Sequence, residues 1–307
     1  MYLKHFGFNE FPFSLTPNLR FFCSLHAYKE ALNVIMVSLY NGEGFIKITG
    51  EVGTGKTMLC RKLLSILGNE YIAVYIANAT LDTLGLQKTI AQELGITIHN
   101  DIDTHQLLNL LTAKLVTLHN LGNRIVIIID EAHALSDQTL EGLRLLSNLE
   151  TADKKLMQFV LVGQPELNLK LKKIHLRQLE QRIIFSYNLP KLHNRNQLLS
   201  YLCAHLATAG YKNTYDTLFS TQAVKLLLKA SRGIPRLINI LGHKAFLITY
   251  GYNEKKVDAK AIKMAIADTE STFHPTIALA KYSSLKIVLA FLLLITILGI
   301  CGYFIIN

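Results

Sequence analysis

The sequence predicts an α/β protein with a three-layer core around a parallel sheet, a small all-α unit after it, and a C-terminal transmembrane helix. Three observations predict this organisation. Short apolar, β-branched runs alternate with helical patterns as far as Pro190, which is typical of a parallel sheet. Only helical patterns follow as far as about residue 270. The run 287–306 carries no charge.

The first 190 residues divide into two predicted segments. Residues 1–40 form an aromatic-rich lead and then a helix from about His26 to Tyr40. Residues 41–190 form the α/β core, whose strands are expected at 45–49, 71–77, 124–130, 159–163 and 183–189. The run RIVIIID at 124–130 is almost wholly β-branched, which indicates a strand that is covered on both faces.

The second part of the chain is predicted to be helical. Residues 191–270 form a unit with helices expected at 195–208, 220–231, 234–250 and 257–269, and residues 271–286 form a linker. Residues 287–306 are long enough to span about 30 Å as a helix, which is enough to cross a bilayer. A buried helix of a soluble protein is the alternative, but such helices rarely lack a polar face.

Net charge and cysteine spacing indicate the kind of partner and the cellular compartment of the protein. The 307 residues carry a net charge of +10, which suits a polyanionic partner, either nucleic acid or an anionic membrane surface. The four cysteines are scattered without C-x-x-C spacing, which favours a reducing cytosol over a disulfide framework or a zinc site. Lys281 and Lys286 precede the apolar run, so the positive-inside rule places residues 1–286 in the cytoplasm.

The stretch GEVGTGKT matches the pattern of a phosphate-binding loop between a predicted strand and a predicted helix. Its glycines allow successive backbone N–H groups to turn toward a phosphate. Lys56 is expected to reach the β- and γ-phosphates of ATP, and the Thr57 hydroxyl to bind Mg²⁺. The alternative is a chance match in a glycine-rich turn. The predicted nucleotide-binding residues of the loop are Gly50, Glu51, Val52, Gly53, Thr54, Gly55, Lys56, Thr57 and Met58.

An acidic pair ends the third predicted strand. Asp130 is expected to bind Mg²⁺ with Thr57, and Glu131 to polarise the water that attacks the γ-phosphate. An exposed acidic pair at a strand end is common by itself. Its position downstream of a phosphate loop favours ATP hydrolysis.

Two polar residues nearby have open roles. His133 is either a catalytic or signalling residue or, as we favour, a loop residue that contacts the neighbouring strand. Gln164 follows the fourth strand directly. It either reaches the γ-phosphate and the attacking water or is a turn residue before Pro165.

Three arginines are candidates for transition-state stabilisation. Arg177 and Arg182 lie in a helical pattern before the fifth strand, and either could reach the γ-phosphate of a neighbouring subunit. Arg236 lies in the helical unit and could contact a nucleotide bound to its own chain. A solvated or salt-bridged arginine is the alternative for each.

These motifs together resemble the ExeA/GspA group of AAA+ ATPases over residues 1 to about 270. The segments that carry the resemblance are FGFNEFPFSLTPNLRFF, GEVGTGKT, IIIDEAH, LVGQPEL, LEQRI and GIPRLIN. The pattern GxxxxGKT is shared by a vast superfamily, whereas the N-terminal block combined with LVGQPEL is far more specific. The resemblance implies a P-loop core and a helical lid.

The resemblance also implies roles. Gln164 falls at the sensor 1 position, where Asn or Thr is more typical, and Arg236 matches the sensor 2 arginine. Arg182 is the better candidate for the arginine finger and Arg177 the weaker one. The implied protein is a homo-oligomeric, Mg²⁺-dependent ATPase in the bacterial inner membrane. It assists assembly of a type IV pilus, of the MSHA kind, or of a secretin.

Two rival functions remain at this point. A DNA-acting AAA+ ATPase of the transposition-accessory type would use the positive charge for phosphate contacts. No convincing helix-turn-helix is visible and a membrane segment does not suit that role, so nucleic acid is not the expected partner. A nucleotide-gated scaffold would bind ATP and barely hydrolyse it, against which Glu131 argues.

Overall fold

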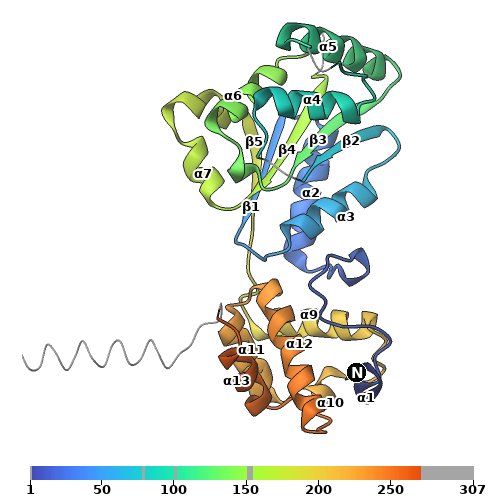
Figure 1. Cartoon of the computed structure of the whole chain (residues 1–307), viewed down its shortest axis with the longest axis vertical. Coiled ribbons are helices and arrows are strands. Elements are labelled where there is room, and N and C mark those ends of the chain that lie inside the picture. The colour runs from blue at the N-terminus through green and yellow to red at the C-terminus, as the bar shows by residue number, and fades with distance from the viewer. Residues whose placement is uncertain (1, 78–79, 100–101, 151–154, 271–307) are drawn as a thin grey trace, which may run out of the picture.

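The computed structural model describes residues 2–77, 80–99, 102–150 and 155–270. An α/β body and a helical body lie one above the other along the long axis of the molecule (Figure 1). The predicted linker at 271–286 and the predicted transmembrane helix at 287–306 lie outside the described residues. Among the residues described, no helix has the length and apolar character that crossing a bilayer requires.

The α/β body is built on a parallel sheet. In the described part of the chain this sheet has five strands in the order β2-β3-β4-β1-β5, and all neighbours pair in parallel. The central strand β4 is buried along its whole length, as an unbroken apolar run predicts. The strands are β1 (Phe45–Gly50), β2 (Tyr71–Ile76), β3 (Arg124–Ile129), β4 (Met157–Gly163) and β5 (Ile183–Leu189).

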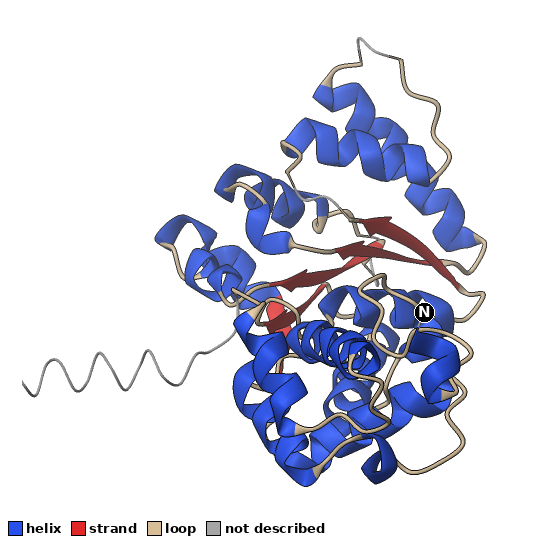
Figure 2. Ribbon diagram, turned by 60° about the horizontal axis from the view of Figure 1, so that its bottom comes forward, coloured by secondary structure: helices blue, strands red, loops and turns tan. Residues whose placement is uncertain are grey.

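Helices cover both faces of the sheet (Figure 2). Alternate residues of β3 point to opposite faces, so that Ile127 packs with one layer and Ile128 with the other. One layer holds α2 (His26–Tyr40) and α3 (Lys56–Ile66). The other holds α4 (Thr83–Glu93), α5 (Thr104–Asn120) and α6 (Asp137–Leu146), with α7 (Glu166–Leu171) and α8 (Arg177–Arg182) beside them.

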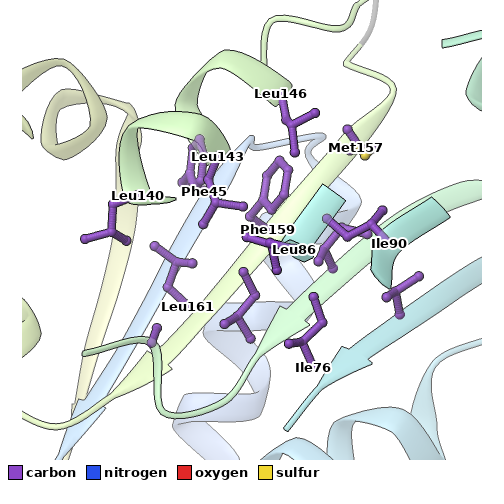
Figure 3. Packing of buried hydrophobic residues seen from close by; sticks show 14 of the residues in the cluster. Phe45, Ile76, Leu86, Ile90, Leu140, Leu143, Leu146, Met157, Phe159 and Leu161 are labelled. Atoms are coloured by element: carbon purple, nitrogen blue, oxygen red, sulfur yellow. The ribbon is translucent and has the colours of Figure 1, made fainter. Parts of the chain in front are cut away.

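The second layer has a dense core. Phe45 of β1 stacks on Phe159 of β4 with ring centroids 4.9 Å apart. Leucines of α6 and α4 pack over the two rings and the neighbouring strands (Figure 3). Burial of this apolar surface fixes the strands, and therefore fixes the loops that leave their carboxyl ends.

The helical body is the lid. Its helices are α9 (Arg195–Thr208), α10 (Tyr215–Leu218), α11 (Thr221–Ser231), α12 (Pro235–Gly251) and α13 (Ala259–Ala267). The N-terminal helix α1 (Tyr2–Phe6) and the residues after it pack into this same hydrophobic cluster. Phe246 of α12 stacks on Tyr2 and on Phe13. The aromatic lead therefore shares its core with the lid, although more than 180 residues separate them in sequence.

The predicted α/β core with a parallel sheet and the all-α lid are confirmed. Short 3₁₀ turns complete the fold at Leu19–Phe21, Ala132–Ala134 and Ile174–Leu176. The helices α1, α6, α7 and α10 were not among the predicted elements.

Candidate nucleotide-binding site

The phosphate loop joins β1 to α3. Gly53 and Gly55 have φ angles of 81° and 93°, in the left-handed region that favours glycine. A Cβ on Gly55 would lie 2.8 Å from the hydroxyl of Tyr28. That hydroxyl donates a hydrogen bond to the Thr54 carbonyl at 2.6 Å. Helix α2 therefore supports the loop from behind.

Lys56 is folded into the loop. Its side chain is 5% exposed, and Nζ donates to the carbonyls of Gly50 at 2.9 Å and Glu51 at 3.0 Å. Burial lowers the pKa of the Lys56 ammonium, while the carboxylates of Glu131, Asp130 and Glu51 act in the opposite direction. The Lys56 ammonium thus bonds to carbonyls of its own loop. A bound phosphate would replace these carbonyls as the acceptor of its hydrogen bonds.

A hydroxyl and a carboxylate meet beside the lysine. Thr57 Oγ1 donates to Asp130 Oδ2 at 2.7 Å, across the gap between α3 and the end of β3. Asp130 is 2% exposed and also accepts hydrogen bonds from the Tyr75 hydroxyl at 3.2 Å and the Glu131 amide at 2.9 Å. Burial, and then the Asp130 carboxylate, raise the pKa of Tyr75, which keeps its phenol protonated. These oxygen donors fit a Mg²⁺ ion.

Glu131 begins the turn that follows Asp130. Its φ is 54°, a strained angle for a residue with a side chain. Its side chain is 42% exposed and lines the cavity beside Lys56 and Thr57. The Asp130 carboxylate therefore points inward to the Thr57 hydroxyl, whereas the Glu131 carboxylate faces the cavity.

His133 and Gln164 stand next to Glu131. Gln164 Nε2 lies 3.4 Å from Glu131 Oε2 and 2.9 Å from His133 Nε2, while His133 Nδ1 lies 3.3 Å from Glu131 Oε2. The Gln164 backbone amide also donates to His133 Nδ1 at 3.4 Å, so His133 contacts both the side chain and the backbone of Gln164. Glu131 and Gln164 line the cavity, and His133 is outside its lining. His133 therefore contacts the loop after the neighbouring strand β4, as the favoured prediction stated.

Lys170 secures the backbone of this turn. Its ammonium donates to the His133 carbonyl at 2.7 Å and the Leu135 carbonyl at 2.6 Å. The sequence pattern did not single out this lysine, because its partners are backbone atoms of a turn that lies 35 residues away.

A cavity of about 360 Å³ lies over the phosphate loop. The core, the lid and the segment before α2 all contribute to its walls. Two parts of this wall were not predicted: the segment that includes Ser14, Pro17, Asn18 and Phe22, and the lid residues Tyr201 and Asn239. These parts are linked, because Tyr201 donates to Asn239 at 2.8 Å and Asn239 donates to the Ser14 carbonyl at 3.4 Å.

The three candidate arginines lie in different places. The Arg236 amide donates to the Gly53 carbonyl at 3.1 Å, and its exposed side chain lines the cavity. Arg182 donates from Nη1 to Ser147 Oγ at 2.7 Å. Arg177 is exposed on α8. Among the described residues that line the cavity, Arg236 alone of these three is present.

The fold and the site define a class for the α/β body, which matches an AAA domain with a phosphate-binding loop. The family described as AAA domain matches residues 39–171, which contain the phosphate loop, the acidic pair and Gln164. The chain is related to general secretion pathway protein A of Aeromonas hydrophila, with 38% identity over 265 residues. The match covers 86% of this chain and 48% of that protein, so the chain spans about half the length of this curated relative.

Solved structures share the fold. The Cdc6p protein of Pyrobaculum aerophilum superposes with a TM-score of 0.64 at 17% identity, covering 83% of this chain and 69% of that one. The ORC2 protein of Aeropyrum pernix, solved in ADPNP–ADP complexes, gives 0.59 at 19% identity, covering 82% and 69%. Both matches extend beyond the α/β core into the helical lid.

Proposed function

We propose that this protein is a Mg²⁺-dependent AAA+ ATPase that uses ATP hydrolysis to drive or regulate the assembly of a secretin or a type IV pilus. One observation carries the catalytic part. The buried lysine, the Thr57–Asp130 pair and the open carboxylate of Glu131 converge on one cavity, which the lid closes with Arg236.

Each residue has a step in this scheme. Lys56 exchanges its two carbonyl partners for the β- and γ-phosphates. Thr57 and Asp130 would hold Mg²⁺, which would neutralise part of the phosphate charge. Glu131 accepts a proton from the attacking water, and Gln164 orients that water or senses the γ-phosphate.

The lid couples this chemistry to movement. Helix α12 begins at Pro235, and its second residue, Arg236, is bonded to the phosphate loop through its backbone. A nucleotide that contacts the Arg236 side chain therefore pulls on α12 as a whole. In a homo-oligomer, Arg182 or Arg177 of an adjacent subunit supplies the finger, with Arg182 preferred.

The proposal also includes a cellular location and partners. We place the protein in the bacterial inner membrane as a single-pass protein with a cytoplasmic ATPase domain. Residues 287–306 are the anchor, and pilus or secretin assembly proteins are the partners. The relation to a general secretion pathway protein and the uncharged run support this setting. Within the group, we propose a protein like the MSHA pilus biogenesis protein MshM, because the chain as a whole resembles it.

Hydrolysis assays on the full chain test the catalytic part. Lys56→Ala should lose ATP binding, because it removes the charge that faces the phosphates. Glu131→Gln should keep binding and slow turnover by about 10² or more, because an amide cannot accept the proton. Hydrolysis at the wild-type rate in both variants would refute the site assignment. A wild-type chain that binds ATP and does not turn it over would instead support the scaffold reading.

Pull-down of the full-length protein from detergent-solubilised membranes, with and without ATP, tests the setting. Nucleotide-dependent recovery of pilus or secretin components is expected. Recovery of the protein wholly in the soluble extract would contradict the anchor.

A further inference from the structure

The positive charge of this protein is unevenly distributed. Residues 41–190 contain fifteen lysines and arginines and fifteen aspartates and glutamates, so the core segment has a net charge of zero. Residues 191–270 contain twelve basic and five acidic residues, a net charge of +7. The lid segment therefore accounts for most of the +10 of the whole chain, and the core, which holds the phosphate loop and the acidic pair, adds nothing to it.

Much of this charge lies on two neighbouring helices. α11 and α13 start from one point, because Ser220 donates to the Val257 carbonyl and Val257 donates to the Leu218 carbonyl. The two helices then run side by side along the lid (Figure 1). α11 buries its alanine, valine and leucine side in the lid core, and α13 buries its alanine and isoleucine side there. Their remaining sides face outward, and those sides carry lysine.

We define the lysine face as the exposed residues Lys225, Lys229, Lys256, Lys260 and Lys263. The spacing places Lys225 and Lys229 four residues apart on α11, and Lys260 and Lys263 three apart on α13, so each pair shares one side of its helix. The exposed side of the lid also includes Tyr252 and Met264, which are 55% and 38% exposed. Lys260 Nζ lies 4.8 Å from the centroid of the Tyr252 ring.

The acidic side chains near the lysine face are mostly engaged elsewhere. Asp258 caps α13 by accepting from the Ala261 amide at 2.8 Å. Asp268 is paired with Lys244 at 2.8 Å. Asp216 accepts a hydrogen bond from the Thr214 hydroxyl and lies within electrostatic reach of Lys256. Glu254 and Glu270 are exposed and are the other two acidic residues of the lid segment. The face therefore presents a positive surface to a partner.

We propose that the lysine face binds the anionic headgroups of the membrane to which the protein is anchored. Lysine combined with an exposed tyrosine and an apolar side chain is typical of surfaces that sit at the headgroup level. α13 is also the last described helix before the predicted anchor. The sixteen residues 271–286 reach at most about 55 Å when fully extended.

This inference rests on the membrane anchor of the proposed function and adds which side of the molecule meets the lipid. The lid is also the part that moves with the nucleotide in the proposed mechanism. Headgroup contact would therefore restrain the element that the ATPase cycle displaces, and lipid charge would act on turnover.

Lysine footprinting on the full chain tests the proposal. The protein is reconstituted with vesicles of phosphatidylcholine alone or of phosphatidylcholine with phosphatidylglycerol, and acetylation of each lysine is followed by mass spectrometry. The lysine face should react several-fold more slowly with the anionic vesicles, since each lysine near such a surface gains a factor of about five. Exposed Lys29 and Lys172 on the α/β body are the internal controls, and each should react at the same rate with both kinds of vesicle. The protection should disappear at about 1 M salt, where the Debye length is about 3 Å.

A variant tests whether the face acts as a unit. With Lys225, Lys229, Lys260 and Lys263 changed to Gln, Lys256 should lose its protection. Substitution of Lys29 and Lys172 by Gln should leave it intact. Both variants should melt like the wild type, because all the altered side chains are exposed.

The remaining outcomes are distinct. Equal acetylation of the face with both kinds of vesicle overturns the proposal. Protection by duplex DNA without protection by phosphatidylglycerol also overturns it, in favour of nucleic acid. An alkaline wash of the same vesicles reports the anchor separately. A chain that stays bound after the wash but shows no protection would support the anchor and overturn the lysine face. A chain that washes off but whose lysine face was protected would support the lysine face and contradict the anchor.

Discussion

Two histidines, one partly exposed and one buried, serve this protein in different ways. His133 stands behind Glu131 and Gln164 and touches both, at 3.3 and 2.9 Å. His205 lies in the lid, 5% exposed, with its Nδ1 2.8 Å from the Pro12 carbonyl and the rings of Phe13 and Tyr201 against it. The first can position reacting groups, and the second ties the N-terminal lead to α9.

His133→Ala should lower kcat for ATP hydrolysis about tenfold and leave KM for ATP nearly unchanged. The reason is that it removes the contact that aligns the Glu131 carboxylate, without touching the cavity. His133→Asn, which keeps a polar group near the Nδ1 position, should recover part of the loss. His105→Ala, on the exposed side of α5, is the matched control. A KM effect without a kcat effect would mean that His133 supports nucleotide binding instead.

Burial lowers the pKa of His205 to about 4, while its hydrogen bond to the Pro12 carbonyl acts the other way. The unfolded chain titrates near 6.5, so between these values it binds more protons than the folded protein. Above pH 6.5 His205 is neutral in both states, and its burial has no protonation cost. The free energy of unfolding should fall by up to about 3 kcal/mol as the pH drops from 6.5 to 4.

Denaturant unfolding at several pH values checks this effect. The His205→Gln variant should show a flatter dependence on pH over that range, and His105→Gln should follow the wild type. An unchanged slope in His205→Gln would assign the acid sensitivity to other groups.

At the scale of elements, the connection between α11 and α12 places the lid against the phosphate loop. Gly233 has a φ of 70°, and a Cβ there would lie 1.9 Å from the Leu192 carbonyl oxygen. The Gly233 carbonyl accepts from the Leu192 amide at 2.8 Å, and Arg236 follows three residues later. The glycine thus brings the start of α12 to the nucleotide.

Gly233→Ala should therefore destabilise the lid by at least 1–3 kcal/mol and weaken ATP binding, because the backbone must move to admit the methyl group. Thermal melting and fluorescent-nucleotide titration measure the two effects. Gly251→Ala at the end of α12 is the control, since a Cβ there meets nothing within 4 Å. Equal behaviour of the two variants would show that the Gly233 turn tolerates a side chain.

Local sequence information was sufficient for the five described strands and for most of the longer helices. The strands at 124–129 and 183–189 and the helix at 26–40 follow from β-branched runs and helical periodicity, which depend on near neighbours. The phosphate loop and the acidic pair could be predicted for the same reason. Each is a short motif next to a predicted strand.

Contacts between distant segments could not be predicted in this way. No local pattern shows that Ser14 and Asn239 meet over the cavity, or that Lys170 holds the turn after Glu131. The side-chain contact of His133 with Gln164 depends on β3 and β4 being neighbours in the sheet, an order that the sequence pattern leaves open.

At the scale of the whole molecule, both the α/β body and the lid line the cavity. A bound nucleotide should therefore stabilise the two bodies together. ATP with Mg²⁺ at 100 times Kd should stabilise the wild-type chain by about 2.7 kcal/mol, because only the folded state binds. The melting temperature should rise accordingly, and core and lid should unfold in one transition. Lys56→Ala should show no rise. Stabilisation of the core alone would mean that the lid does not clasp the nucleotide.

The shared core of the N-terminal lead and the lid also bears on how the chain folds as it is synthesised. Tyr2, Phe6 and Phe13 leave the ribosome more than 230 residues before Phe246 and Ile262, which lie in the same cluster. The α/β body can close once β5 has emerged, whereas the aromatic lead must wait for more than 200 residues. Until then its rings are open to water, so this segment is the natural target for a chaperone on the nascent chain.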